Sequence, residues 1–242
     1  MYRIVLVSLV VLAGFASACG PLASSPKLAP VVGSVPFSDG ERLTYSIRGG
    51  DLGGLGGKGT LSVHRDGANL ILDQSYEEVS PPAGAKRNVD VAQVSATAAE
   101  LRPIWMQRGI RGRDESRNYR ADYTADGKTV AVTQDTDKPK SIPVPEIIYD
   151  NESSLWLWRT LALADGYTAR YVSLDAVGKT RQTVDLTVTG KQNIIVPAGT
   201  FEAWRLQVRN GRATRVAWIN VAAPHEIVQW DNGAQVFQLE SR

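Results

Sequence analysis

The chain has 242 residues, of which 43% are hydrophobic and 21% charged, so it is long enough to bury the core of one globular domain. Its 27 basic and 25 acidic residues give a formal net charge of +2, which argues against the concentrated positive surface that nucleic-acid binding needs. The sequence contains one cysteine, Cys19, which excludes an internal disulfide and a cysteine-based metal site.

Residues 1–18 have the pattern of an export signal peptide. Arg3 supplies the positive start, residues 4–15 form an apolar stretch, and Ala16-Ser17-Ala18 is a small-residue cleavage site. The apolar stretch is shorter than the about 20 residues that a membrane-spanning helix needs. We therefore expect this segment to be removed from the mature protein.

Cys19 directly follows this cleavage site and resembles the acylated cysteine of bacterial lipoproteins, although Ala16 stands where those signals usually have leucine. The resemblance implies lipid attachment at Cys19. It also implies a membrane-anchored, exported protein on the outer side of the cytoplasmic membrane, or in the periplasm or outer membrane. The alternative is a soluble secreted protein with a free N-terminal thiol, which would be unusual. We predict lipidation.

Residues 19–36 are rich in Pro, Ala, Ser, Gly and Val and carry one charge, Lys27. Such a segment has too few periodic apolar positions to form a helix or strand, so we expect a tether between anchor and domain. The folded domain is then residues 37–242, a single β-rich unit.

Alternating apolar and polar residues dominate this domain and predict short strands in antiparallel order. Leu43, Tyr45 and Ile47, for example, alternate with polar neighbours, and Asp66-Gly67 marks a turn between two such runs. The expected strands are 42–48, 59–65, 69–79, 89–98, 101–107, 116–124, 128–134, 167–174, 181–188, 214–220, 226–230 and 234–239, together with the hairpin 192–208.

Residues 151–164, NESSLWLWRTLALA, predict the main helix. Asp150 is a plausible N-cap, Glu152 lies in the first turn, and Asp165-Gly166 ends the pattern. Apolar residues surround most of the circumference, so the helix must be covered on more than one side. We therefore expect it to lie in the concavity of a curved sheet.

The hairpin 192–208, QNIIVPAGTFEAWRLQV, has a turn specified by Pro197 and Gly199. The apolar phase changes after the turn, which predicts a bulge or a crossing between layers. Trp204 is expected to be buried on the same face as Leu206 and Val208.

Four segments together resemble an exported bacterial family known as domain of unknown function 3108. These segments are FSDGERLTYSI, SLWLWRTL, VPAGTFEAWRL and VAWINVAAPHEIVQW, and the resemblance extends from Phe37 to Leu239. It implies an all-β fold with one main helix, in which the helix packs against the concave face of a strongly curved antiparallel sheet or half-open barrel. The family has no established catalytic residues, so the resemblance assigns none here.

No catalytic constellation is readable in the sequence, and we expect the protein not to be an enzyme. His64 and His225 lack a second ligand at metal spacing, so no metal is predicted, and no motif calls for a cofactor. The arginines at 108, 111, 113, 117 and 120 form the one basic cluster, which could contact anionic lipid headgroups or a polyanionic glycan. We expect instead that they lie on a solvated face with counter-ions such as Asp114, Glu115 and Asp122.

Two functional classes remain open. In the first, the curved sheet and helix enclose a groove that binds a hydrophobic small molecule, with Trp156, Trp158 and Trp204 as candidate ligand-binding residues. In the second, side chains fill the groove and the domain is a structural or interaction module for another envelope protein. The expected partners are thus the membrane and either a hydrophobic molecule or an envelope protein, and not nucleic acid.

Overall fold

The computed structural model describes residues 30–49, 56–113, 115–211 and 213–242. The predicted signal peptide, the predicted lipidation site Cys19 and most of the predicted tether lie outside these residues, as does Asp114. Within them, no helix is long and apolar enough to cross a membrane.

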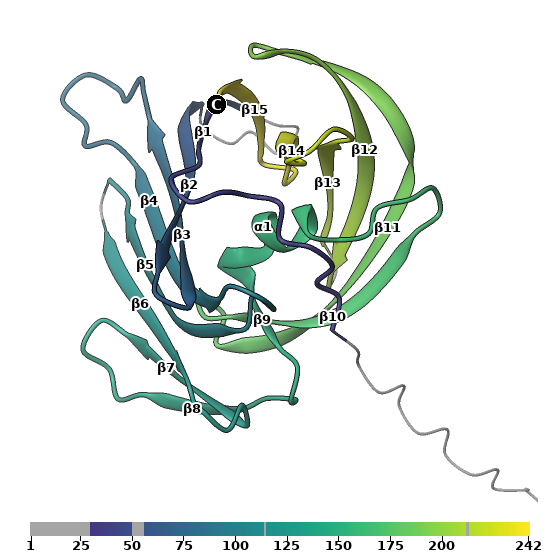
Figure 1. Cartoon of the computed structure of the whole chain (residues 1–242). Helices are drawn as coiled ribbons and strands as arrows, with labels where there is room; N and C mark the ends of the chain where they lie inside the picture. The colour runs from purple at the N-terminus through teal and green to yellow at the C-terminus, as the bar shows by residue number, and fades with distance from the viewer. Residues whose placement is uncertain (1–29, 50–55, 114, 212) are drawn as a thin grey trace, which may run out of the picture.

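Across the described residues, fifteen strands form one sheet that curves around a short helix (Figure 1). They are β1 (Arg42–Gly49), β2 (Gly57–Asp66), β3 (Asn69–Glu78), β4 (Val89–Thr97), β5 (Pro103–Arg111), β6 (Ser116–Tyr123), β7 (Thr129–Gln134), β8 (Lys140–Pro143), β9 (Tyr149–Asp150), β10 (Thr168–Asp175), β11 (Thr180–Val196), β12 (Gly199–Asn210), β13 (Ala213–Asn220), β14 (Ile227–Asp231) and β15 (Gln235–Ser241). The sheet order is β8-β7-β6-β5-β4-β3-β2-β1-β15-β14-β13-β12-β11-β10-β9.

The predicted fold class is confirmed: the domain is all-β with one main helix in a curved, unclosed sheet. Neighbouring strands are antiparallel, except that β9 runs parallel to β10. The edge strands β8 and β9 are absent from the sequence prediction. Pro143 ends β8, which is tolerated because an edge strand has one unpaired side, and β9 has only two residues.

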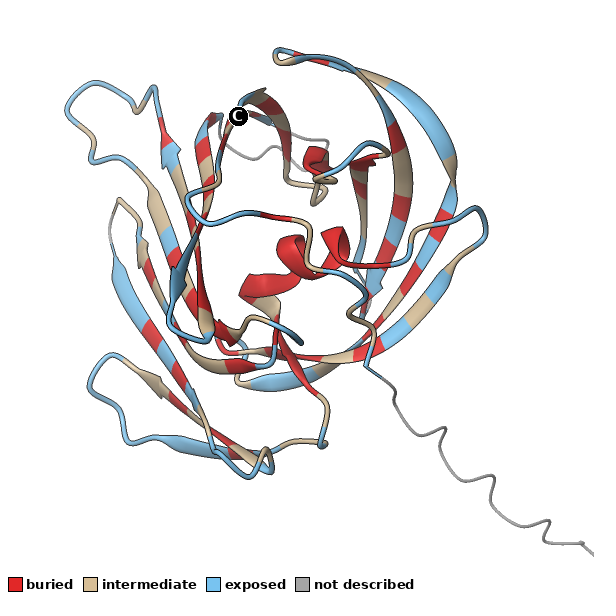
Figure 2. Cartoon of the chain, in the orientation of Figure 1, coloured by how far each residue is buried: buried red, intermediate tan, exposed pale blue. Residues whose placement is uncertain are grey.

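Burial alternates from residue to residue along the strands and shows which face of the sheet packs against the helix. In β1, Leu43, Tyr45 and Ile47 are buried, whereas alternate positions are more exposed. The same alternation runs through the other long strands, and the helix is buried along its whole length (Figure 2). The concave face and the helix therefore form one hydrophobic core.

The helix is shorter than the sequence pattern predicts. A 3-10 turn, η1 (Asn151–Ser153), leads into α1 (Ser154–Arg159), and the prediction that it continues to residue 164 is wrong. Thr160 ends it: its Oγ1 donates to the Leu157 carbonyl at 2.7 Å, and its own carbonyl accepts from Gly33. The predicted N-cap is confirmed, because Asp150 accepts a hydrogen bond from the Glu152 N–H.

The β11–β12 hairpin has the predicted turn. Val196 pairs with Gly199 across Pro197-Ala198, and Gly199 has a φ of 132°, a region that favours glycine. The register shifts between Val188 and Lys191, which is the expected irregularity.

The prediction that Trp204 is buried with Leu206 and Val208 is wrong. Leu206 and Val208 are buried, whereas Trp204 is only half-buried. Trp204 pairs with Lys191, just beyond the register shift, and the Lys191 ammonium lies 4.7 Å from the centre of a Trp204 ring. The Lys191 side chain is itself 41% exposed, so the Trp204 ring lies at the surface edge of the core rather than inside it.

The segment from Val31 to Phe37 packs on the domain, although most of it falls in the predicted tether. It passes in front of α1 in Figure 1, and Val31, Val32 and Val35 contact the core. Gly33 N–H donates to the Thr160 carbonyl at 2.9 Å, and an added Cβ at Gly33 would lie 2.5 Å from that oxygen. We call residues 31–37 the N-terminal strap.

Candidate functional site

A pocket of about 220 Å³ lies in the concave interior beside η1 and the start of α1. One wall comes from β3, β4 and β5, and the opposite wall comes from β13, β14 and β15. The lining residues are Gln74, Tyr76, Asp90, Arg108, Asn151, Glu152, Ser154, Leu155, Trp158, Arg215, Trp230, Asn232, Gln235 and Phe237. Aromatic and charged side chains thus face one another across it.

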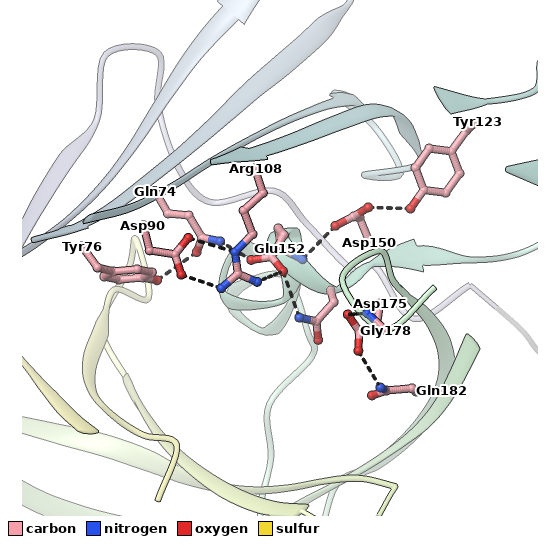
Figure 3. Close-up of polar contacts among 11 residues, drawn as sticks. Gln74, Tyr76, Asp90, Arg108, Tyr123, Asp150, Glu152, Asp175, Gly178 and Gln182 are labelled. Carbon is pink, nitrogen blue, oxygen red and sulfur yellow. Dashed lines mark hydrogen bonds and ion pairs between the residues drawn. The ribbon is translucent and has the colours of Figure 1, made fainter. Parts of the chain in front are cut away.

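Arg108 organises the polar wall (Figure 3). Its Nε donates to Asp90 Oδ1 at 2.9 Å and its Nη2 to Asp90 Oδ2 at 2.5 Å, while Nη1 donates to Glu152 Oε1 at 2.8 Å. Glu152 also accepts from the Gln74 amide at 2.6 Å. Burial alone lowers the pKa of Arg108, but the hydrogen bonds to Asp90 and the charges of Glu152 and Asp90 outweigh it and raise that pKa above its ordinary value.

Strand register explains why this polar group faces inward. Gln74 on β3 pairs with Ala92 on β4, and Ala92 pairs with Arg108 on β5. Two residues away along each strand, the buried residues Leu72, Val94 and Met106 occupy the same inward column. Because side chains alternate between faces, the polar residues must point into the barrel as well.

Behind Glu152, a second carboxylate is fully enclosed. Asp150 is 0% exposed and accepts from Tyr123 Oη at 2.5 Å and from the Glu152 N–H at 2.8 Å. Burial, reinforced by the nearby charge of Glu152, raises the pKa of Asp150 to about 7. Burial and the charge of Asp150 also raise the pKa of Tyr123 well above its ordinary value. Asp150 therefore gains or loses its proton near neutral pH.

The apolar wall is built from Trp158, Trp230, Phe237 and Leu155. The Trp158 and Trp230 rings are tilted by 55° with centres 5.1 Å apart. Trp158 Nε1 donates to Tyr171 Oη at 2.8 Å, so its polar atom is already satisfied. These aromatic residues offer apolar contact area and fixed geometry.

Of the three tryptophans proposed from the sequence, Trp158 lines this pocket. Trp156 is 1% exposed and belongs to the core, and Trp204 lies half-buried on β12 beside Lys191. The structure therefore does not bring the three together around one pocket. The sequence did not predict three other residues that line the pocket, namely Trp230, Arg108 and Glu152. The signal was present for Arg108, which occupies the inward phase of β5.

The five arginines expected to form one solvated face separate in the structure. Arg108 points into the pocket, and Arg113 pairs with Glu78, whose side chain is only 5% exposed. Arg117 pairs with Glu115 and Arg120 with Asp122, as expected of exposed counter-ions. Alternation along β5 and β6 sends neighbouring arginines to opposite faces, so the prediction of one face is wrong for Arg108.

A larger hollow of about 590 Å³ lies mainly over the polar positions of β2 to β7. Thr60 and Ser62, which line it, alternate with the buried Leu61 and Val63, so this hollow is on the outer face. Gln93 donates to Asp73 at 2.6 Å and Gln107 to Gln93 at 3.1 Å, which makes a ladder of satisfied polar groups. The interior pocket is the stronger candidate because Trp158, Trp230 and Phe237 line it, whereas no tryptophan or phenylalanine is among the described residues that line the outer hollow.

Among the residues that the structure describes, no group of three or more His, Cys, Asp or Glu side chains could hold a metal ion. The pocket's acidic groups, Asp90 and Glu152, are both engaged by Arg108. What the arrangement can do is bind a small molecule through one polar and one aromatic wall.

The sequence profile of the family described as "Protein of unknown function (DUF3108)" matches residues 44–236. The chain belongs to this family. The match spans the sheet from β1 to the start of β15 and includes every residue of the pocket's polar wall. No curated protein matches the chain.

Among solved structures, the chain is similar to a beta-barrel-like protein of the DUF1849 domain from Brucella abortus. The TM-score is 0.53 at 11% identity, covering 86% of this chain and 97% of the other, which shows a shared fold. A protein from Bacteroides fragilis described as exported, with a YmcC-like fold, matches with a TM-score of 0.27 at 12% identity over 86% and 98% of the two chains. One from Parabacteroides distasonis described as a lipoprotein gives 0.27 at 11% over 87% and 98%.

Proposed function

We propose that this protein is an exported lipoprotein, anchored in the cell envelope through Cys19, whose β-domain binds a small molecule in the pocket beside α1. The observation that supports binding is the cavity of about 220 Å³ between the Arg108 cluster and the Trp158–Trp230 pair. Pockets that join apolar walls to a few placed polar groups are typical of small-molecule sites. The signal sequence and Cys19 support the location.

The ligand in this proposal is a small amphipathic molecule rather than a long acyl chain. The adjoining apolar space among Tyr45, Leu155 and Trp230 measures only about 10 Å³. Trp156 and Leu157, on the other faces of α1, are 1% and 0% exposed, so the helix fills the remaining interior. A ligand of drug-like size would also exceed the pocket, since such sites usually measure about 300–1,000 Å³.

Binding fits the pocket better than catalysis. A general acid or base needs a carboxyl group that can exchange a proton with a substrate. Asp90 accepts from Arg108 with both oxygens, and Glu152 accepts from Arg108 and Gln74. Asp150, which titrates near neutral pH, is fully buried behind Glu152 and does not line the pocket.

An interaction module is the second candidate, supported by the filled core and by the tip of the β11–β12 hairpin. Ile195, next to the turn, is 78% exposed. An exposed large apolar side chain on a projecting hairpin is a plausible contact for another envelope protein. In this alternative the pocket has no ligand.

Two substitutions by tryptophan test whether the pocket binds a ligand. Leu155 lines the pocket, so the larger ring of Leu155→Trp should fill it. Indole and hexanoate should then lose the saturation-transfer difference NMR signals that they give with the wild-type mature chain. Ile195→Trp adds the same ring outside the pocket and should leave those signals unchanged. Equal signals from both variants, or none from the wild type, would contradict binding at this pocket.

The anchor has its own test. The wild type should partition into the membrane fraction, because two acyl chains bind bilayers far more stably than one. Cys19→Ala should become soluble. Recovery of the wild-type protein in the soluble fraction with an unmodified Cys19 would contradict the prediction that Cys19 carries a lipid anchor.

A further inference from the structure

Arg215 is the unpaired cation of the pocket. It lies on β13, in the same inward column as the buried residues Ala217 and Ile219. Within the described ranges, no carboxylate lies within ion-pair distance of its guanidinium. Its Nε is buried without a hydrogen-bond partner, and its Cζ lies 5.8 Å from the centre of a Trp230 ring.

The opposite wall cannot supply the missing partner, because its charges are already matched. Arg108 uses Nε and both Nη atoms on Asp90 and Glu152. The remaining Glu152 oxygen accepts from Gln74, and Asn151 donates to Oε1 at 3.2 Å. The carboxylates of this wall are therefore held by their own donors, and Arg215 faces the cavity with unused donors.

Nε is too deeply buried for a ligand to reach, so the donors that Arg215 offers to the pocket are those of its two Nη atoms, which make no hydrogen bond among the described residues. A guanidinium presents its donors in a planar fork that matches an oxyanion with two coplanar oxygens. Stacking on Trp230 holds the guanidinium in place before the ligand arrives. These features select an anion with a carboxylate-like head.

We propose that the pocket binds a small organic anion of the monocarboxylate class, with its carboxylate on Arg215 and its apolar part against Trp230, Phe237 and Leu155. This inference rests on the proposed binding function and adds the ligand's charge and orientation. A cation is disfavoured because Arg215 would repel it. A neutral analogue loses the charge-assisted hydrogen bond, which is roughly twice as strong as a neutral one.

The test compares three probes of nearly equal shape by calorimetry on the mature chain: benzoate, benzamide and benzamidine. Benzoate should bind at least about tenfold more tightly than benzamide, the ratio that corresponds to one charge-assisted hydrogen bond. Benzamidine should not bind measurably. The benzoate affinity should also fall as salt is added, because the attraction is partly exposed to solvent.

Arg215→Gln should remove the preference for benzoate over benzamide, and Arg215→Lys should keep part of it. Arg205→Gln is the matched control, since Arg205 stacks on Trp218 at 5.9 Å but does not line the pocket. If Arg215→Gln does not fold, the Lys variant and the wild-type probe series still decide the question.

The outcomes separate this inference from the function beneath it. If benzamide binds as tightly as benzoate, and Leu155→Trp blocks both, the pocket is a ligand site but the anion assignment is wrong. A benzoate preference that survives in Arg215→Gln also overturns the role of Arg215. If none of the three probes binds while indole still gives signals that Leu155→Trp abolishes, the inference fails and the proposed function stands; if indole gives no signal either, both fail.

Discussion

Arg159, in the last turn of α1, forms a two-bond ion pair with Glu41 across the concave interior. The Nη1–Oε1 and Nη2–Oε2 distances are 2.5 and 2.9 Å, and the Arg159 side chain is 1% exposed. The carbonyls of Pro224 and His225 accept from the same guanidinium at 3.0 Å. Its ring neighbour, Phe37, lies 5.1 Å away. This pair therefore joins the helix to the entry of β1.

Removal of Glu41 should be costly because it leaves a buried charge without its partner. We expect Glu41→Ala to lower the free energy of unfolding by about 3–5 kcal/mol. Glu240→Ala is the control: its partner Lys58 is 56% exposed, so the change should be at most about 1 kcal/mol. Urea denaturation of both variants measures this, and equal midpoints would contradict the importance of the buried pair.

Stability should depend on pH through Asp150. Its pKa is about 7 in the folded protein and about 4 in an unfolded chain, so protonation favours folding. The contribution is complete below about pH 4 and is lost as the pH rises to about 7. The difference of about three pKa units corresponds to about 4 kcal/mol.

Asp150→Asn mimics the protonated carboxyl and should flatten this dependence. Denaturation at about pH 5 and about pH 8 should show wild-type stability falling with pH and the variant nearly unchanged. The role of Asp150 would be contradicted if the wild type were more stable at the higher pH and the stability of Asp150→Asn changed with pH to the same extent.

Trp156 and Trp204 should respond differently to truncation. Trp156 is 1% exposed, so Trp156→Ala should cost about 3–5 kcal/mol through the lost contacts and the cavity left behind. Trp204 is half-buried and covered by Lys191, so Trp204→Ala should cost about 1–2 kcal/mol, because less area returns to water. Thermal melts of the two variants test this order, and a larger loss for Trp204→Ala than for Trp156→Ala would contradict the half-buried position of Trp204.

The strap should loosen when Gly33 gains a side chain. The Cβ of Gly33→Ala would meet the Thr160 carbonyl at 2.5 Å, so the Gly33–Thr160 hydrogen bond cannot form unchanged. We expect faster amide exchange for residues 31–35 with nearly unchanged exchange in the sheet. Ser34→Ala is the neighbouring control at an exposed position. Unaltered exchange in Gly33→Ala would mean that the strap does not depend on this contact.

Most of the fold was predictable because it follows from local alternation and turn chemistry. Leu43, Tyr45 and Ile47 show the pattern in β1, and Pro197 with Gly199 fixes the hairpin turn. The end of α1 was not predictable in this way. Thr160 stops the helix through a contact with Gly33, which lies far away in sequence.

The pocket was harder to predict than the sheet. Asp90, Arg108 and Glu152 come from β4, β5 and η1, respectively, and their contact can be predicted only when the strand register is known. A charged residue at an inward position of β5 was the one available sign. Trp204 pairs with Lys191, next to the register shift in β11. The sequence predicted that the hairpin has such an irregularity but not where it lies.

The strap also has a consequence for how the domain is presented. It contacts both ends of the helical segment: Val31 N–H donates to Tyr149 Oη at 3.2 Å, just before η1, and Gly33 N–H donates to the Thr160 carbonyl at 2.9 Å, just after α1. With the proposed anchor at Cys19, the tether therefore joins the domain at its central helical segment rather than at an edge of the sheet.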